Sequence, residues 1–342
     1  MQFIRPDINI DFIGKKKVCF GMSLSLIIIS LLSLVIHGGP NYGIDFEGGT
    51  LVQVRFANTV EIKDIRTGLN QVGLENSSVQ KFGKAGDNEY LIRTSIPEMT
   101  GNGFSQSIAE GLTASTKQAP EIRRVEMVGP QVGKDLRKKA LLAIFFSLLF
   151  ITIYISGRFE QKLVIAGVMA GALMTAVYFI SIFNTSIPIL ITVALSVTLV
   201  LFWFLELKYA MGAIVALIHD VIITVGVFSI LNLEFSLPII AALLTIIGYS
   251  LNDTIIVFDR IRENIRLMNK KDLSLIINRS VNETLSRTIL TSGTTLIVLF
   301  SLLFLGGEII HNFAFAMIIG IIVGTYSSVF VASPILLAWR KK

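Results

Sequence analysis

Residues 237–258 read LPIIAALLTIIGYSLNDTIIVF, an apolar stretch long enough to cross a bilayer, with Asp253 as its single ionisable side chain. A charge inside hydrocarbon costs about 2.5–3.5 kcal/mol on insertion scales, so it is by default a candidate functional group. Asp253 lies about five residues, or roughly 7–8 Å, from the end of the span, too deep for its short side chain to reach water. We interpret Asp253 as a candidate proton carrier. The alternative is a structural hydrogen bond, for example with Asn252.

Neighbouring positions support a site facing the interior of a bundle. Helical spacing places Ile246, Tyr249, Ser250 and Val257 on the same face as Asp253, so that face is mixed in character. Tyr249, on this face, and Asn252, next to Asp253 in the chain, are candidate supporting polar residues.

Three more ionisable residues lie within or at the edge of other apolar stretches. His219 and Asp220 lie mid-span, where a structural hydrogen bond between helices is the favoured interpretation and a proton relay the alternative. Arg287 opens a later span. It either reaches the interior, pairs with Glu283 four residues earlier, or anchors the helix end on the basic side of the membrane.

The composition identifies the class of protein. The chain has 342 residues, of which 53% are apolar and only 16% charged, and its mean hydropathy is +0.71. These values exclude a disordered chain, a nucleic-acid-binding domain and most soluble enzymes. One cysteine and three separated histidines predict no disulfide and no metal site. No nucleophile–base pair appears, so we expect neither a cofactor nor enzymatic activity.

Eight apolar segments predict a polytopic helical membrane protein. The expected spans are Val18–Ile36, Leu141–Ile155, Leu163–Phe183, Ile187–Leu205, Ala210–Leu231, Leu237–Phe258, Thr288–Leu305 and Phe313–Ala338. Basic residues gather at the N-terminus, in the loops on one side and at the C-terminus, whereas the short loops on the other side have none. The positive-inside rule therefore places both termini in the cytoplasm and explains the net charge of +6 without nucleic acid.

A single soluble domain is expected outside the membrane, over residues 37–136. Alternating and helical patterns predict the order βαββαβ, which is that of a ferredoxin-like fold. The predicted elements are Thr50–Phe56, Glu61–Val72, Ser78–Phe82, Glu89–Ser95, Phe104–Gln118 and Glu121–Val128.

The remaining divisions follow from these two parts. Residues 1–36 form the cytoplasmic N-terminus and first span, 137–162 the second span and its loop, 163–206 a transmembrane hairpin, and 207–342 the C-terminal bundle. Within the last, residues 259–287 are basic and amphipathic. We expect this segment to lie along the membrane surface, with a solvated loop as the alternative.

Several stretches, in order along the chain, resemble the motifs of one family. The most characteristic is Gly248–Thr254, continued by Val257–Asn264, and the others are Gly43–Thr50, Val128–Gly133, Ala213–Asp220, and Arg287-Thr288 with Thr291-Ser292. Together they resemble the SecF family of protein-export membrane proteins, part of the SecD/SecF group in the RND superfamily. The resemblance covers nearly the whole chain.

The resemblance implies a function and a set of partners. The family pairs with SecD beside the SecYEG channel, often with YajC, in the bacterial inner membrane. It uses the proton motive force to promote late export of unfolded polypeptides. Its proton path includes an Asp and an Arg that map onto Asp253 and Arg287, and a further acidic residue lies on SecD. The implied ligands are thus protons, unfolded chains and the lipid bilayer.

The chain departs from the family pattern at one place. The family has six spans, whereas here Arg158-Phe159-Glu160 is followed by two additional apolar segments, residues 163–206. Since these contain no ionisable residue within their spans, we interpret them as a hairpin for packing or partner binding. The alternative function is a half-size RND-type exporter of a small molecule. An assembly subunit without a proton role is a third reading.

Overall fold

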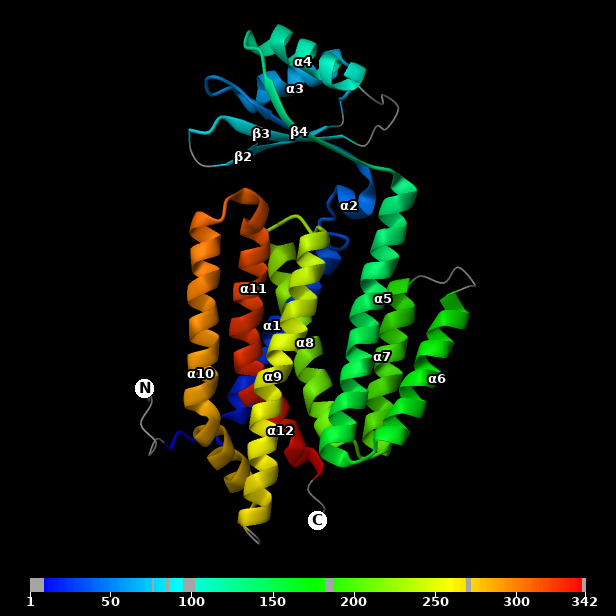
Figure 1. Cartoon of the computed structure of the whole chain (residues 1–342), viewed down its shortest axis with the longest axis vertical. Coiled ribbons are helices and arrows are strands. Elements are labelled where there is room, and N and C mark those ends of the chain that lie inside the picture. Colours follow the sequence, from blue (N-terminus) through cyan, green and yellow to red (C-terminus); the bar gives the residue numbers. More distant parts are fainter. Residues whose placement is uncertain are drawn as a thin grey trace.

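The chain forms a bundle of long helices with a small α+β domain at one end. The computed structural model describes residues 9–75, 77–83, 86–94, 102–181, 187–268 and 272–339. In Figure 1 the helices run nearly parallel to the long axis, the domain rests on their upper end, and both ends of the chain lie at the lower end. The predicted fold class, a polytopic helical bundle with one α+β domain, is confirmed.

Long apolar runs form the bundle because a helix satisfies its own backbone hydrogen bonds in lipid. The helices are α1 (Lys16–Ile36), α5 (Pro130–Ile155), α6 (Leu163–Ser181), α7 (Ile187–Phe204), α8 (Lys208–Ile230), α9 (Leu237–Leu267), α10 (Leu273–Leu305) and α11 (Glu308–Ser327). The π-helical turn η1 (Ser156–Glu160) ends α5. A second π turn, η2 (Ser328–Ala332), continues α11 into α12 (Ser333–Ile335) and η3 (Leu336–Trp339).

Seven of these helices are long and apolar enough to cross a membrane within the described residues. The eighth, α7, is apolar, but its segment Ile189–Phe204 is shorter than that length. The residues between α6 and α7, 182–186, lie outside the described residues, as do the basic residues 340–342.

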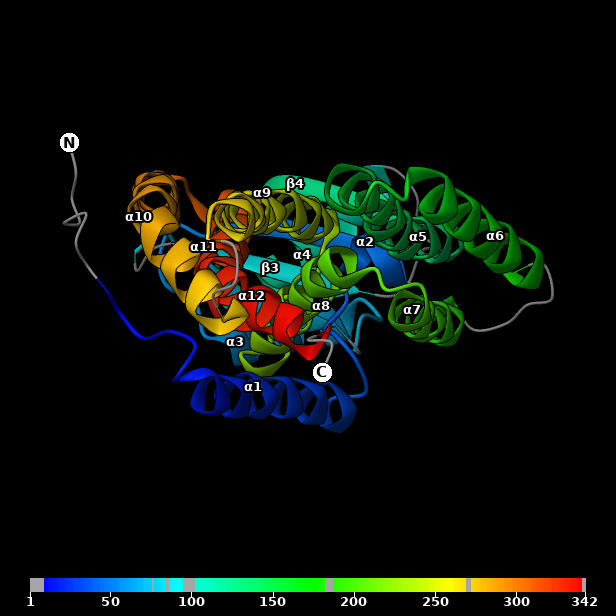
Figure 2. The ribbon, with the colours of Figure 1, turned by 90° about the horizontal axis from the view of Figure 1, so that it is seen from below.

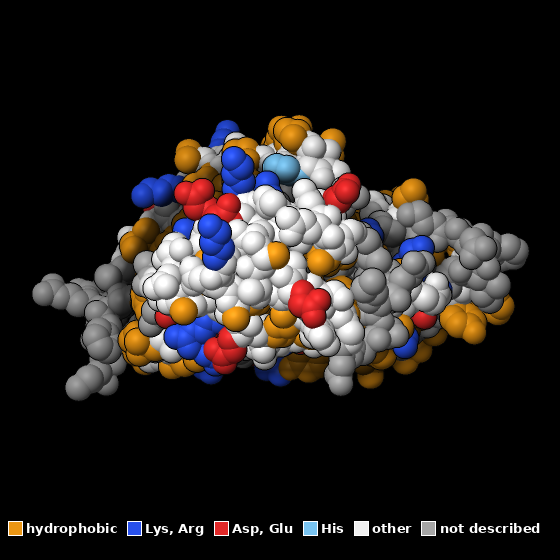
Figure 3. Space-filling model, turned by 90° about the horizontal axis from the view of Figure 1, so that it is seen from above, with side chains coloured by type: hydrophobic (Ala, Val, Ile, Leu, Met, Phe, Trp, Pro, Cys, Tyr) orange, Lys and Arg blue, Asp and Glu red, His pale blue; other side chains and the backbone are white. Residues whose placement is uncertain are grey.

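The predicted ferredoxin-like order is present in the small domain at the upper end of the bundle, residues 49–128, which we call the outer domain. Its elements are β1 (Gly49–Arg55), α3 (Ile62–Gln71), β2 (Ser78–Phe82), β3 (Glu89–Thr94), α4 (Asn102–Thr116) and β4 (Glu121–Val128). The sheet order is β2-β3-β1-β4 and all neighbours are antiparallel. Buried Val52, Val54 and Ile92 pack against Ile65 of α3 and Leu112 of α4. The outward face carries interspersed acidic and basic side chains (Figure 3).

The glycine-rich stretch before β1 contains one helical turn, α2 (Ile44–Glu47). Gly48 has φ +80°, and a Cβ there would lie 2.7 Å from the Pro130 Cα atom. Glycine is therefore required where α2, β1 and the start of α5 meet.

The outer domain is tied to the loop between α8 and α9. The Gly43 N–H donates to the Phe235 carbonyl at 2.9 Å, and the Leu237 N–H donates to Asp45 Oδ2 at 2.8 Å. Arg93 of β3 forms an ion pair with Glu234. These contacts connect the domain directly to the start of the helix that carries Asp253.

The expectation that residues 259–287 lie along the membrane surface is wrong. Helix α9 continues without a break to Leu267, and α10 already begins at Leu273. The two extensions form a helical hairpin that prolongs the bundle at its lower end (Figure 1). Residues 259–267 contain neither Gly nor Pro, so the helix has no breaker there.

Candidate functional site

The buried polar residues of the bundle gather where α8, α9, α10 and α11 meet. Seen along the helix axes, α9, α10 and α11 lie together on one side of the bundle, with α1 along its edge (Figure 2). Asp220 comes from α8 and Asp253 from α9, and each is 1% exposed. The two carboxyl groups differ in the hydrogen bonds that they accept.

Asp220 is held by hydrogen bonds from three residues. Its Oδ2 accepts from Ser250 Oγ of α9 at 2.6 Å and from Ser327 Oγ of α11 at 2.9 Å. Its Oδ1 lies 2.9 Å from His219 Nδ1. Loss of such partners would be costly for a buried carboxyl group. Asp220 therefore stabilises the packing of α8 against α9 and α11.

The network continues from His219 to α1. His219 Nε2 lies 3.2 Å from Ser23 Oγ, and Ser23 Oγ lies 3.1 Å from the Tyr326 hydroxyl. The Tyr326 hydroxyl donates to the Cys19 carbonyl at 2.8 Å. The arrangement agrees with the interpretation of His219 and Asp220 as an interhelical hydrogen-bonding pair.

Close helix packing at Gly324 makes the Asp220 contacts possible. A Cβ at Gly324 would lie 2.9 Å from the Ser250 Cβ atom and 3.4 Å from Asp220 Oδ2. Gly320, one turn earlier, faces Ile246 in the same way. The Gly320–Gly324 motif therefore brings α11 against α9, as small residues at this spacing do in membranes.

We expect Gly324→Ala to weaken the bundle, because the added methyl group must displace Ser250 from Asp220. The loss of stability should be about 1–3 kcal/mol. The matched control is Gly171→Ala on α6, where nothing lies within 4 Å of the added Cβ. Thermal unfolding of the purified variants measures the difference. Equal midpoints for both variants would show that Gly324 does not set this contact.

Asp253 has a weaker set of partners. Its Oδ2 accepts one long hydrogen bond, 3.4 Å, from Ser292 Oγ of α10. Ser292 in turn lies 2.7 Å from Thr325 Oγ1 of α11. A hydrogen bond of that length contributes little to stability. Asn252 is exposed on the outer side of α9, so it is not the partner that the structural alternative required.

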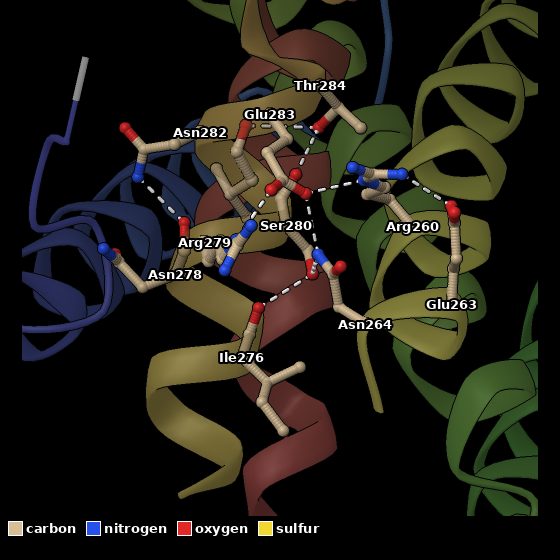
Figure 4. A network of polar contacts seen from close by, with 11 residues as sticks. Arg260, Glu263, Asn264, Ile276, Asn278, Arg279, Ser280, Asn282, Glu283 and Thr284 are labelled. Atoms are coloured by element: carbon tan, nitrogen blue, oxygen red, sulfur yellow. Dashed lines mark hydrogen bonds and ion pairs between the residues drawn. The ribbon is translucent and has the colours of Figure 1, made fainter. Parts of the chain in front are cut away.

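Arg287 lies one helical turn before Thr291 on α10, and its side chain is exposed. It is near enough to act on Asp253 electrostatically, but the two form no ion pair in the structure. The alternative pair with Glu283 is not formed either. Glu283 instead binds Arg279 at 2.7 Å and Arg260 at 2.6 Å, as Figure 4 shows. Among the described residues, Arg287 therefore has no ion-pair partner on the α10 surface.

The remaining candidate, Tyr249, is half-buried, and its hydroxyl lies 3.2 Å from Thr295 Oγ1 of α10. Sequence reasoning missed most of the residues that complete the two clusters, namely Ser23, Thr325, Tyr326 and Ser327. Uncharged serines and threonines are common in membrane helices, where they bond their own backbone, so nothing in the pattern separates these from the others.

The ion pair between Arg93 and Glu234 is partly buried where the domain meets the bundle. Burial raises the pKa of Glu234 above its ordinary range, although the Arg93 guanidinium acts in the opposite direction. Between the unfolded and the folded pKa, the folded chain binds more protons than the unfolded chain. Stability from this group is therefore present below the unfolded pKa and is lost as the pH rises through the folded pKa.

We accordingly expect Glu234→Gln to flatten the fall in thermal stability that accompanies a rise in pH above the ordinary titration range of a glutamate. Exposed Glu61→Gln is the control. Unfolding midpoints measured across that rise in pH test the point. Parallel pH profiles for wild type and Glu234→Gln would contradict it.

Comparison with known proteins places this architecture in a family. The family model "Protein export membrane protein SecD/SecF, C-terminal" matches residues 108–195 and 180–342, and the "SecD/SecF GG Motif" model matches residues 34–60. Protein translocase subunit SecF of Desulfurispirillum indicum is 41% identical over 339 residues, covering 97% of this chain and 92% of that protein. The SecF of Vibrio alginolyticus is 40% identical over 337 residues, covering 98% and 91%.

Solved structures agree with this assignment. The crystal structure of SecDF, a translocon-associated membrane protein from Thermus thermophilus, matches with a TM-score of 0.72 and 32% identity, covering 99% of this chain and 40% of that one. SecDF in a super-membrane-facing form matches with a TM-score of 0.62 and 33% identity, covering 98% and 39%.

The fold and these matches therefore define a polytopic membrane protein of the protein-export class. At about 40% identity over nearly its full length, the chain belongs to the SecF family of protein translocase subunits. The resemblance inferred from the motifs is confirmed.

Proposed function

We propose that this chain works with a SecD partner at the bacterial inner membrane, where the proton motive force drives late steps of protein export. Both termini face the cytoplasm, and the ferredoxin-like domain faces the periplasm. The SecYEG channel, in some assemblies YajC, and the unfolded exported polypeptide are the further partners. Family membership and the apolar helices support this proposal. No enzymatic step and no cofactor is needed.

Asp253 is the proton-coupling residue in this proposal. The observation that carries the assignment is the contrast between the two buried carboxyl groups: Asp220 has three partners, whereas Asp253 has one long hydrogen bond. A group with few fixed partners loses little when its charge changes. Arg287, exposed on α10 and without an ion pair, is the cation toward which an ionised Asp253 is drawn. Protonation removes that attraction, and α9 moves relative to α10.

Movement of α9 is passed to the outer domain through the loop that precedes it. Glu234 and the Leu237 N–H connect the start of α9 to Arg93 and Asp45. The first and second spans supply further connections, because α1 and α5 lead into and out of the domain. Cycles of movement in the periplasmic domains then hold and release the exported chain and prevent backsliding.

The energy available is adequate for such a switch. At 100 mV, each elementary charge that crosses the membrane contributes about 2.3 kcal/mol, which biases a two-state equilibrium roughly fifty-fold. Neither anchoring in the lipid nor contact with the exported chain needs a further source of energy in this proposal.

The α6–α7 hairpin is a peripheral element in this proposal. It packs on α5 and α8 and lies on the opposite side of the bundle from α10 (Figure 2). The family model matches in two stretches that overlap at residues 180–195, inside this hairpin, which supports its being an insertion. Its outer face, which includes exposed Val164, Val193 and Phe204, is suited to lipid or to a partner helix.

The test is export in cells depleted of their own SecD–SecF pair. The chain is supplied together with its own SecD, and secretion of a labelled precursor is followed over time. Restored export supports the proposal. If the pair assembles in the membrane but export stays at the depleted level, the function is wrong. Resistance of the same cells to toxic small molecules would instead favour the RND-type exporter.

A further inference from the structure

The N-terminal segment is bound to the surface of α10 by two asparagines. Asn278 Oδ1 accepts from the Phe12 N–H at 2.8 Å and from the Ile13 N–H at 3.2 Å. Asn282 Oδ1 accepts from the Ile10 N–H at 2.8 Å. Both amide groups donate back to the Ile10 carbonyl, at 3.0 and 2.9 Å. Two side chains one helical turn apart therefore bind the backbone of an extended segment.

These asparagines take no part in the neighbouring ion network. Figure 4 shows Asn278 and Asn282 on the side of α10 that faces the N-terminal segment, whereas Glu283 points toward Arg260 on α9. Asn282 also donates to the Asn278 carbonyl at 2.8 Å, which fixes its orientation. The bound segment then continues into α1 (Figure 2).

The side chains of the bound segment differ in their burial. Phe12 is 8% exposed and Ile13 4% exposed, and both belong to the main apolar core, whereas Ile10 is 39% exposed. The segment thus inserts Phe12 and Ile13 into the lower end of the bundle and leaves Ile10 outside.

From Phe12 a row of rings leads to the buried carboxyl group. The Phe12 and Phe330 ring centroids are 5.6 Å apart, those of Phe330 and Tyr326 are 5.0 Å apart, and those of Tyr326 and His219 are 6.1 Å apart. His219 bonds to Asp220. Phe330 lies in the π turn η2, a type of irregularity that is frequent at functional sites.

We propose that Phe12, held by Asn278 and Asn282, is a plug that closes the lower end of this row and controls the access of water to the His219–Asp220 pair. The binding site is the Asn278–Asn282 surface of α10, and its ligand is the chain's own N-terminal segment. Because the segment precedes α1 and its site lies on α10, relative movement of these helices withdraws the plug. That this end faces the cytoplasm rests on the proposed function, but the closure itself does not.

Thiol reactivity behind the plug tests the proposal. The reporter is Ser327→Cys in a Cys19→Ser background, in the full chain in lipid nanodiscs, where a water-soluble maleimide reaches both membrane faces. We expect Phe12→Ala to raise the labelling rate about tenfold or more, since labelling then needs no local opening. The double variant Asn278→Ala, Asn282→Ala should do the same. Ile10→Ala is the matched control and should leave the rate unchanged, because only its backbone is bound.

Cysteines placed at two further positions distinguish loss of the plug from general unfolding of the bundle. A cysteine at exposed Leu275 should react quickly in every variant, and one at Ala242, in the core toward the other end of α9, should stay protected. If the Ser327→Cys rate is the same with Phe12 and with Ala at that position, the proposal is wrong. It is equally wrong if Ile10→Ala accelerates labelling as much as Phe12→Ala does. None of these rates depends on export, so failure of the plug and failure of the proposed function are distinguishable.

Discussion

Asp253→Asn is expected to abolish the gradient-dependent part of export while the protein still folds and assembles. Asparagine has nearly the same shape and keeps an oxygen that accepts from Ser292, so the single hydrogen bond at this position survives. It cannot bind or release a proton. The roughly fifty-fold bias available from one charge at 100 mV is then lost, and we expect export to fall at least about tenfold.

Two matched variants sharpen this prediction. Asn252→Ala changes the neighbouring exposed side chain and should leave export unchanged. Asp253→Glu keeps a titratable group but lengthens it inside a packed site, so partial activity is expected. Export by Asp253→Asn at the wild-type rate, with normal assembly, would return Asp253 to a structural role.

Asp220→Ala should instead destabilise the bundle. It removes the acceptor for Ser250 and Ser327 and the partner of His219, all of which are buried. Each buried polar group left without a partner costs about 1–3 kcal/mol, and the total approaches the whole stability of many proteins. We expect a strong fall in the amount of folded protein and in its unfolding midpoint.

Asp220→Asn gives the informative comparison. Its one carbonyl oxygen can accept from only part of the set that the carboxyl group binds, so its stability should lie between wild type and Asp220→Ala. Size-exclusion profiles and thermal unfolding in detergent measure the series. An Asp220→Ala protein as stable as wild type, but inactive in export, would show that Asp220 belongs to the proton path rather than to the framework.

The sequence predicted the parts of the structure that depend on periodic burial. Alternation around Val52 and Val54 predicted β1, and the order of the domain followed from similar patterns. Apolar length predicted the spans. Asp253 is conspicuous in the sequence because it is an ionisable residue in an apolar run. Whether it forms a hydrogen bond with Asn252 depends on which way each side of the helix faces, and one sequence does not fix that orientation.

Other features required the tertiary structure. The bonds from Ser250 and Ser327 to Asp220 join helices far apart in sequence, and no charge signals their role. The segment after Phe258 is amphipathic whether it turns along a membrane or continues as a helix. Here it continues, and Asn264 bonds to Ser280 across the hairpin at 3.0 Å.

Proton flux is the most direct test of the central claim that the membrane gradient acts through Asp253. The chain and its SecD are reconstituted into liposomes with SecYEG and an exported precursor, a pH gradient is imposed, and a lumenal dye reports proton movement. The account predicts flux that depends on the assembled pair and disappears with Asp253→Asn, while Asn252→Ala keeps it. Undiminished flux through the Asp253→Asn complex would contradict the account.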